Sequence, residues 1–297
     1  MPERATFSVI VPTRDRRESL DRCLTSLARM EYPRGDYEVI VVDDGGSVSP
    51  CEVVDRHGQS MNVTLASVSH AGPASARNAG IEKSRFEFLA FTDDDCTADP
   101  AWLECLARRL LESRGSVVGG KVLNGLRENR YARASQGLQD FLYQWYHEER
   151  RGDLPFFTTN NLAVARRDMD EIGGFDSSFP FASEDRDWCD RAMLAGRDLV
   201  YASGAVVHHW HGMNLRTFLA QHFRYGQGAV RFHETRAGRR GVRVRLESLS
   251  FYTGMLASPF AAGSPAPAID ALLLMASQSA SFAGFASEMA RRRAGTA

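Results

Sequence analysis

An apolar stretch of strand length, Phe88 to Phe91, is followed almost at once by three consecutive aspartates, Asp93, Asp94 and Asp95. A strand that is apolar throughout is usually buried on both faces, inside a sheet covered by helices. Three adjacent negative charges repel one another and cannot belong to that core. We therefore expect them at the end of the strand, in solvent or around a cation. Oxygen ligands suit Mg²⁺ or Mn²⁺, and these cations suit phosphate, so the sequence predicts a metal-diphosphate site here.

Strands and helices alternate on both sides of this stretch. The other strands are expected over residues 7–12, 37–42, 62–68, 116–122, 157–165 and 199–207. The helices are expected after residue 13, over 51–57 and 74–83, from residue 100, and over 183–195. This alternation predicts an α/β fold with a doubly wound, mostly parallel central sheet flanked by helices.

Polar residues follow three of these strands, and they should meet in one crevice. They are Pro12-Thr13-Arg14, Asp43-Asp44 and Asp93-Asp94-Asp95. In doubly wound sheets, ligands bind outside the carboxyl ends of the strands. The pattern indicates a nucleotide site, although the chain has neither a GxGxxG fingerprint nor a Walker A loop. For Asp43-Asp44 the alternative is a simple turn. Arg77 is a candidate for binding diphosphate through its planar guanidinium, the alternative being a solvated helix face.

Composition limits the partners and the compartment. The formal net charge is −1, so nothing in the overall charge favours nucleic acid as a partner. The five cysteines are an odd number without CxxC spacing, which argues against a disulfide framework and fits a reducing cytosol. The sequence contains no signal-peptide pattern and no uninterrupted run of about 18 apolar residues. We therefore predict a cytoplasmic protein without a transmembrane helix.

The last part of the chain, residues 213–297, differs in character from the rest. A basic, aromatic helix is expected from Leu215 to about Glu234, then a basic tract over 236–245 and an apolar end rich in Ala, Ser, Pro and Gly. We expect this C-terminal helical extension to pack on the rest of the protein. A homodimer contact and a peripheral membrane contact are the alternatives. Residues 124–155, which are polar with interspersed aromatics, are expected to form a helical excursion or a lid.

Two groups of residues further along the chain are candidates for chemistry. Glu184 and Asp185 begin a predicted helix, where acidic side chains favour the helix dipole, but a carboxylate there is also a candidate general base. His208, His209 and His211 lie at the end of a predicted strand. They are either surface residues or metal ligands. Adjacent strand residues point to opposite faces, so His208 and His209 cannot both enter one site. A zinc site is disfavoured, because no Cys/His set of structural spacing accompanies them.

The order of these motifs resembles that of the family 2 glycosyltransferases with the GT-A fold. The resemblance covers about residues 6–212 and is carried by Ser8-Val9-Ile10-Val11-Pro12-Thr13, Val41-Val42-Asp43-Asp44-Gly45, Gly72, Ala76-Arg77-Asn78-Ala79-Gly80, Phe91-Thr92-Asp93-Asp94-Asp95, Gly173-Gly174-Phe175-Asp176 and Glu184-Asp185. It implies an inverting enzyme that transfers a sugar from a nucleotide-diphosphate sugar to a hydroxyl acceptor. The expected donor is a UDP-sugar, with dTDP- and GDP-sugars as alternatives. The acceptor would be a glycan, a lipid-linked glycan or a natural product.

The resemblance also implies roles for donor-side residues. The nucleobase would contact Pro12, Thr13, Arg14 and Asp44, with Arg77 near the base or the diphosphate. Arg14 stands where relatives often have an aromatic residue, which leaves the base preference open. The DxD motif would be formed by Asp93, which holds the ribose, and Asp95, which holds Mn²⁺ or Mg²⁺. Asp94 lies between them, so which of the three touches the cation stays open, and His208 would be a late metal ligand.

On the acceptor side, the resemblance implies that Asp185, next to Glu184, is the catalytic base. The acceptor would be lined by Asn161, Gly174, Phe175, Asp176 and Trp210. We accordingly predict a donor-binding half over residues 1–98, an acceptor-binding half over 99–212 and the extension over 213–297.

Two other functions compete with this prediction. A sugar nucleotidylyltransferase also combines a doubly wound domain with an acidic metal site. It normally has a Gly-rich basic loop after its first strand, and residues 12–17 here supply arginines but no glycine. A non-enzymatic module that binds nucleotide sugars or glycans is the second alternative, and the Glu184-Asp185 pair argues against it.

Overall fold

The computed structural model describes residues 4–149, 151, 154–179, 182–242 and 247–295. The chain forms two compact units. The first consists of Met1–Leu123, Phe156–Ser178 and Trp188–Trp210, and the second of Asn124–Pro155, Phe179–Asp187 and His211–Ala297. The predicted boundaries at residues 98 and 212 separate a donor-binding half, an acceptor-binding half and the C-terminal extension. They do not coincide with the two compact units, and this functional division stays a prediction.

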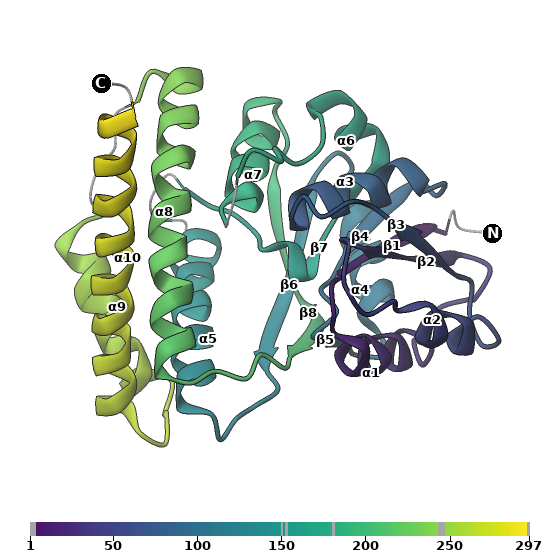
Figure 1. Ribbon diagram of the computed structural model, residues 1–297, viewed down its shortest axis with the longest axis horizontal. Coiled ribbons are helices and arrows are strands. Elements are labelled where there is room, and N and C mark those ends of the chain that lie inside the picture. Colours follow the sequence, from purple (N-terminus) through teal and green to yellow (C-terminus); the bar gives the residue numbers. More distant parts are fainter. Residues whose placement is uncertain (1–3, 150, 152–153, 180–181, 243–246, 296–297) are drawn as a thin grey trace. The chain divides into compact units, whose positions relative to one another are not determined.

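An eight-stranded sheet forms the centre of the first unit (Figure 1). The strand order across the sheet is β3-β2-β1-β4-β7-β6-β8-β5. The strands are β1 (Phe7–Thr13), β2 (Tyr37–Asp43), β3 (Val63–Ser67), β4 (Phe88–Phe91), β5 (Cys96–Ala98), β6 (Val117–Asn124), β7 (Leu162–Ala165) and β8 (Leu199–His209). All the predicted strands are present, although β7 is shorter than predicted because a 3₁₀ turn, Thr159–Asn161, precedes it. The short strand β5 was not predicted.

Half of the sheet is parallel. β1 pairs with β2 on one side and β4 on the other, and β2 pairs with β3. In the β1–β2 pair, Thr13 lies opposite Asp43, so the carboxyl ends of these strands are level. The α/β fold with a helix-flanked sheet is thereby confirmed. The pairs β4–β7, β6–β7 and β5–β8 are antiparallel, a feature that strand–helix alternation does not reveal.

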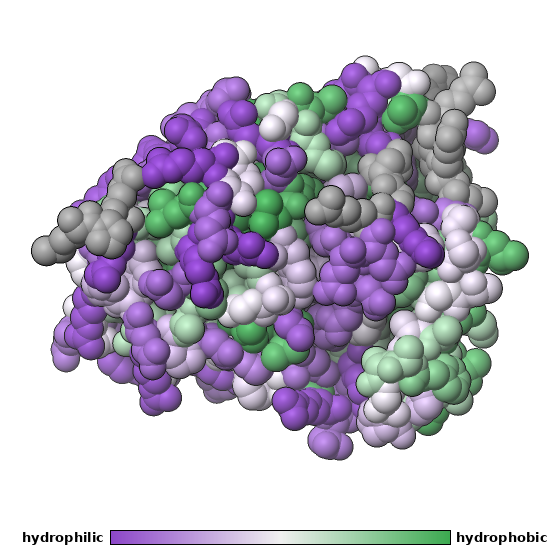
Figure 2. Space-filling view, turned by 180° about the vertical axis from the view of Figure 1, so that it is seen from behind, coloured by the Kyte–Doolittle hydropathy of each residue, from purple (hydrophilic) through white to green (hydrophobic). Residues whose placement is uncertain are grey.

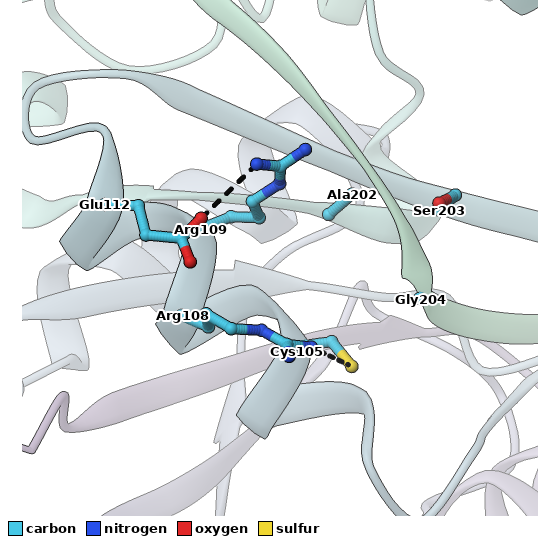
Figure 3. Close-up of a pocket in the computed structure, with 7 residues that line it drawn as sticks. All are labelled: Cys105, Arg108, Arg109, Glu112, Ala202, Ser203 and Gly204. Atoms are coloured by element: carbon cyan, nitrogen blue, oxygen red, sulfur yellow. Dashed lines mark hydrogen bonds and ion pairs between the residues drawn. The ribbon is translucent and has the colours of Figure 1, made fainter.

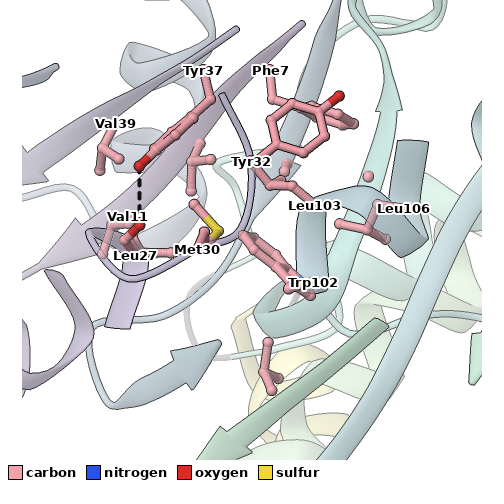
Figure 4. Packing of buried hydrophobic residues seen from close by; sticks show 14 of the residues in the cluster. Phe7, Val11, Leu27, Met30, Tyr32, Tyr37, Val39, Trp102, Leu103 and Leu106 are labelled. Carbon is pink, nitrogen blue, oxygen red and sulfur yellow. Dashed lines mark hydrogen bonds between the residues drawn. The ribbon is translucent and has the colours of Figure 1, made fainter. Parts of the chain in front are cut away.

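Helices cover both faces of this sheet, which explains why its central strands are apolar throughout. The helices are α1 (Arg17–Leu27), α2 (Cys51–His57), α3 (Pro73–Lys83), α4 (Trp102–Glu112) and α6 (Arg166–Ile172). Val39 and Val41 of β2 pack into the cluster formed with α1 and α4, part of which Figure 4 shows. Ile40 and Val42 point to the other face, where they pack with Ala76 of α3.

The second unit is mainly helical. It contains α5 (Arg130–Tyr143), a π-helical turn (Gln144–Glu148), α8 (Leu215–Arg240), α9 (Leu249–Ala261) and α10 (Pro267–Gly295). The first turn of α7 (Glu184–Leu194) also belongs to it. Of the two predictions for residues 124–155, the helical one is therefore confirmed. Helix α8 continues six residues beyond its predicted end, and α9 was not predicted.

Helices α8 and α10 lie side by side, with close backbone contact at two glycines (Figure 1). A Cβ atom on Gly226 would lie 1.8 Å from the carbonyl oxygen of Ser281, and one on Gly284 would lie 1.9 Å from that of Phe223. By length and composition, α10 is apolar enough to cross a membrane. Length and composition alone do not place a helix in a membrane, so the predicted absence of a transmembrane helix stays a prediction.

The close contact of α8 and α10 makes the second unit sensitive to one methyl group. We expect Gly284→Ala to lower the free energy of unfolding by about 1–3 kcal/mol, because the new methyl collides with backbone rather than with a movable side chain. Gly238→Ala on α8 is the matched control, since nothing lies within 4 Å of its Cβ position. That variant should be neutral or more stable. Thermal unfolding followed by circular dichroism measures both, and equal midpoints would contradict the packing described.

A buried histidine in α8 gives the second unit a dependence on pH. The ring nitrogens of His222 make no hydrogen bond within the described residues, and burial lowers its pKa to about 4. An unfolded histidine titrates near 6.5, so between these values the unfolded chain takes up a proton that the folded chain does not. Stability should therefore fall by about 3 kcal/mol as the pH drops from 6.5 through 4.

His222→Phe keeps a ring against Phe218, whose ring centroid lies 4.5 Å from that of His222, and removes the titrating group. The difference in unfolding midpoint between wild type and this variant should change steadily between pH 6.5 and 4. Parallel curves over this range would show that His222 does not titrate as described.

Candidate nucleotide and metal site

The three aspartates after β4 are held by side chains from two other elements of the first unit. Arg16, just before α1, donates from Nη1 to Asp95 Oδ2 at 2.9 Å and to Asp94 Oδ1 at 3.2 Å. Arg77 of α3 donates from Nη2 to Asp93 Oδ1 at 2.8 Å. The carboxylate cluster is therefore neutralised in part by two guanidinium groups. Arg16 was not among the predicted site residues, although an arginine between a strand end and a helix start is a recognisable signal.

The middle aspartate of the three is turned into the protein. Asp94 is buried, and its Oδ2 accepts a hydrogen bond from the Thr13 hydroxyl at 2.7 Å, so it joins the ends of β1 and β4. Burial raises the pKa of Asp94 to about 6, against the opposing effects of Arg16 and the Thr13 hydrogen bond. This leaves Asp93 and Asp95 as the pair with the spacing of a DxD motif.

Asp95 lies against a histidine of β8. The strands β5 and β8 pair with Cys96 opposite His209, which brings His209 Nε2 to 3.2 Å from Asp95 Oδ1. Burial opposes a charge on His209, but its hydrogen bond with Asp95 and the charges of Asp95 and Asp93 raise its pKa above the ordinary value. A carboxylate and an imidazole at this separation are suited to sharing a cation.

The predicted metal ligand His208 is placed elsewhere. Its Nε2 lies 3.0 Å from Oδ1 of Asp99, and the pairing of β5 with β8 sets it opposite Thr97. Neighbouring residues on a strand point to opposite faces, so His209 and not His208 reaches Asp95. His209 is therefore the histidine of β8 that adjoins Asp95 and could share a cation with it, while the ligand role of His208 stays a prediction. His211 follows two residues later and belongs to the second unit.

The end of β2 is closed by a hydrogen-bonded loop. Asp44 accepts from the backbone N–H groups of Ala71 and Gly72 at 2.9 and 3.1 Å, and its Oδ2 lies 2.8 Å from His70 Nδ1. Arg14 Nη1 lies 2.9 Å from the other ring nitrogen of His70. Asp44 thus holds the loop before α3 in place. The nucleobase contacts predicted for Pro12, Thr13, Arg14 and Asp44 stay predictions. His70, which was not predicted, contacts two of these residues, Arg14 and Asp44.

The loop after α6 is fastened to α3, the helix that carries Arg77. Asn78 Nδ2 donates to the Phe175 carbonyl at 2.7 Å, and the Phe175 N–H donates back to Asn78 Oδ1 at 2.8 Å. A Cβ on Gly174 would lie 2.5 Å from that oxygen, so a larger residue there would displace the Asn78 side chain from its bonds to Phe175. The Phe175 ring is buried against Phe91. Gly174 and Phe175, both predicted to line the acceptor, therefore help to hold this loop against α3 and β4. Asp176 accepts from the Ser178 N–H at 2.9 Å.

Two other predicted acceptor residues have structural partners. Asn161 is fully buried, accepts from Trp102 Nε1 at 2.9 Å and donates to the carbonyls of Lys121 and Ala205. These bonds hold α4 and the sheet together, and the acceptor contact of Asn161 stays a prediction. Trp210 donates from Nε1 to Thr97 Oγ1 at 2.9 Å and is half-buried.

The predicted base lies in the second unit, in the first turn of α7. Ser183, just before it, has a φ of 81°, a left-handed conformation that costs a non-glycine residue roughly 1–3 kcal/mol. Asp187, one turn on, accepts from Thr235 and from Arg239 of α8, at 3.2 and 2.8 Å. The turn that carries Glu184 and Asp185 is thus fixed against α8. Asp185 is half-buried, and its Oδ1 accepts from the N–H of Arg186.

A hollow on the surface of the first unit contains none of these residues. It is lined by α4 and β8, through Cys105, Arg108, Arg109, Glu112, Ala202, Ser203 and Gly204 (Figure 3). Arg109 is paired with Glu112 at 3.3 Å. None of the residues assigned to the candidate site lines this hollow.

A parallel half-sheet with carboxylates at its strand ends, continued by antiparallel strands, is the architecture of GT-A glycosyltransferases. A mannosyltransferase from Pyrobaculum calidifontis, solved with GDP-Man and Mn²⁺, has this fold at a TM-score of 0.62 and 19% identity, with 99% of this chain and 76% of that one covered. Staphylococcus aureus TarS, solved with UDP-GlcNAc, has the fold at a TM-score of 0.55 and 17% identity, with 97% of this chain and 92% of that one covered. At these identities the likeness concerns the fold.

Within that class, residues 8–173 match the model of glycosyl transferase family 2, and the chain belongs to this family. The resemblance drawn from the motifs is confirmed. A relative, the pre-mycofactocin glycosyltransferase of Mycobacterium tuberculosis, is 32% identical over 236 residues, which cover 77% of this chain and 48% of that protein. The chain thus spans about half the length of this curated relative.

Proposed function

We propose that this chain transfers a sugar from a nucleotide-diphosphate sugar to an acceptor hydroxyl, with inversion at the anomeric carbon. One observation carries the proposal. Beside the ends of β1 and β4, Thr13 and Arg16 bond to Asp94 and Asp95, and Arg77 bonds to the adjacent Asp93. Such a group offers carboxylates to a cation and guanidinium groups to a diphosphate. Membership of family 2 supports the reaction class.

The residues at this site fit a divalent cation. Asp95 and His209 present an oxygen and a nitrogen 3.2 Å apart, and Asp93 adds a second carboxylate two residues from Asp95. We propose that these residues hold Mn²⁺ or Mg²⁺. When bound, the cation offsets the negative charge that builds on the leaving diphosphate. Arg16 and Arg77 bind the diphosphate oxygens through their planar guanidinium groups.

We assign the proton transfer to Asp185. Its carboxylate removes the proton of the acceptor hydroxyl as that oxygen attacks the anomeric carbon. Attack from the face opposite the leaving diphosphate inverts the configuration in one displacement, so no covalent sugar-enzyme intermediate forms. Glu184 is the neighbouring carboxylate of the same turn.

The donor nucleotide and the acceptor belong to the same proposal. We propose a UDP-sugar, with the base held by Pro12, Thr13, Arg14 and Asp44, and keep dTDP- and GDP-sugars as alternatives. The TarS complex with UDP-GlcNAc supports the first, and the P. calidifontis complex with GDP-Man supports the last. The acceptor is a hydroxyl of a glycan, a lipid-linked glycan or a natural product, and the compartment is the cytoplasm.

The base assignment predicts a separation of binding from turnover. We expect Asp185→Asn to lower turnover by about 10²–10⁴-fold, because the hydroxyl loses its proton acceptor, while nucleotide-sugar affinity changes little. Asp170→Asn, on α6 with a 64% exposed side chain, is the control and should keep full activity. Product formation and calorimetric donor binding are measured together. An Asp185→Asn protein that turns over normally would remove Asp185 from this role.

The metal assignment predicts which histidine matters. EDTA should suppress donor binding, and Mn²⁺ or Mg²⁺ should restore it. We expect His209→Ala to weaken Mn²⁺ binding, followed by electron paramagnetic resonance, at least about tenfold. His208→Ala, the adjacent residue facing Asp99, should leave Mn²⁺ affinity unchanged. If the His208 variant loses Mn²⁺ affinity instead, His208 is the metal ligand, as the resemblance to family 2 implies.

A further inference from the structure

The outward side of α10 contains no charged residue over most of its length. Between residues 268 and 290, its exposed positions form one stripe at helical spacing: Ala268, Ile269, Leu272, Met275, Ser279, Phe282, Ala283, Ala286, Ser287 and Ala290. The two acidic residues of the helix are buried on its other side. Asp270 is paired with Arg133 of α5, and Glu288 with Arg291 and Arg292. A surface helix of a soluble protein normally has the reverse pattern.

Helix α9 extends this uncharged surface. Leu249 and Phe260 are 79% and 58% exposed, and the chain from Ser248 to Ala290 contains no charged residue except the buried Asp270 and Glu288. We call the exposed large residues of both helices the apolar face: Leu249, Phe260, Ile269, Leu272, Met275 and Phe282. Figure 2 shows apolar residues gathered at the lower right, over these helices. Side chains of this kind in such a group mark an interaction site.

The charge of the same segment indicates what the apolar face meets. Residues 213–297 contain eleven arginines and four acidic residues, a formal charge of +7, whereas the whole chain carries −1. Arginines are concentrated where α8 and α10 end, over 236–240 and 291–293. Of these, Arg236 is buried and Arg239 is paired with Asp187, whereas Arg291 and Arg293 are exposed. Apolar side chains combined with an excess of arginine match a bilayer surface that contains anionic lipid. A second copy of the chain fits less well, because it would bring two strongly positive segments together.

The packing of α10 also decides between lying on a membrane and crossing it. The helix is long enough to span a bilayer, but its inner side is committed to the second unit. Gly226 and Gly284 bring its backbone against α8, and Asp270 is bonded to Arg133. Crossing a bilayer would separate this buried pair and expose both charges to lipid. The outer stripe can enter the interfacial layer without breaking either contact.

We propose that the apolar face of α9 and α10 docks the protein on a membrane surface rich in anionic lipid. The large apolar side chains enter the boundary between headgroups and acyl chains. Arg291 and Arg293, which are exposed at the end of α10, and Arg240, which is half-buried at the end of α8, contact lipid phosphates. This proposal does not depend on the transfer reaction proposed above.

The test is sedimentation of the full chain with vesicles. One set contains phosphatidylcholine alone, and the other contains phosphatidylcholine with phosphatidylserine. Wild type should bind the anionic vesicles at least about tenfold more strongly than the neutral ones, and added salt should reduce that binding. Equal binding to both sets, or none, would overturn the proposal. These measurements need no variant, so they decide the matter even if a substitution prevents folding.

A double variant then locates the contact. We expect Leu272→Gln with Phe282→Gln, at positions 60% and 71% exposed, to weaken binding to anionic vesicles about tenfold or more. Leu194→Gln is the control, because this leucine is 47% exposed in the first unit and lies outside the apolar face. A double variant that binds like wild type would overturn the assignment. Light scattering that detects a dimer, lost in the double variant and unaffected by lipid, would identify a second copy as the occupant.

Discussion

The concentration of negative charge after β4 is the constraint on which the first unit depends. Three adjacent carboxylates beside a buried strand are unfavourable unless cations and hydrogen-bond donors surround them. The structure supplies Arg16 from the start of α1, Arg77 from α3 and His209 from β8. Each of these elements must therefore be held at a fixed place. The same contacts that make the charge tolerable also set the order of the elements around the strand ends.

The second unit distributes polarity in a different way. Its charged residues include pairs buried between helices, such as Arg133 with Asp270, while large apolar side chains of α9 and α10 face outward. Close glycine contacts between α8 and α10 allow the two backbones to approach without large side chains between them. Single exposed apolar residues are ordinary on a protein surface, whereas a group of them, as on α9 and α10, is typical of an interaction surface.

The sequence was most informative about features that are local in the chain. The strand ends, the short helix over 51–57 and the paired motifs of the family were all recognisable from period and turn chemistry. Features that depend on long-range pairing were not. The choice between His208 and His209 required the register of β8 on β5, and the antiparallel half of the sheet has no sequence period of its own. Asn161 carried a family-like signal, but its burial among three partners could not be read from the sequence.

The contact between Arg16 and Asp95 links the two ligands that the site is proposed to bind. Any cation that binds this carboxylate competes with a guanidinium that is already 2.9 Å away. A diphosphate offers the displaced guanidinium two charged oxygens, so it lowers the cost of admitting the cation. Thermodynamic linkage requires the cation to improve diphosphate binding by the same factor. Under the proposed function, this linkage favours the metal-nucleotide pair over either component presented alone.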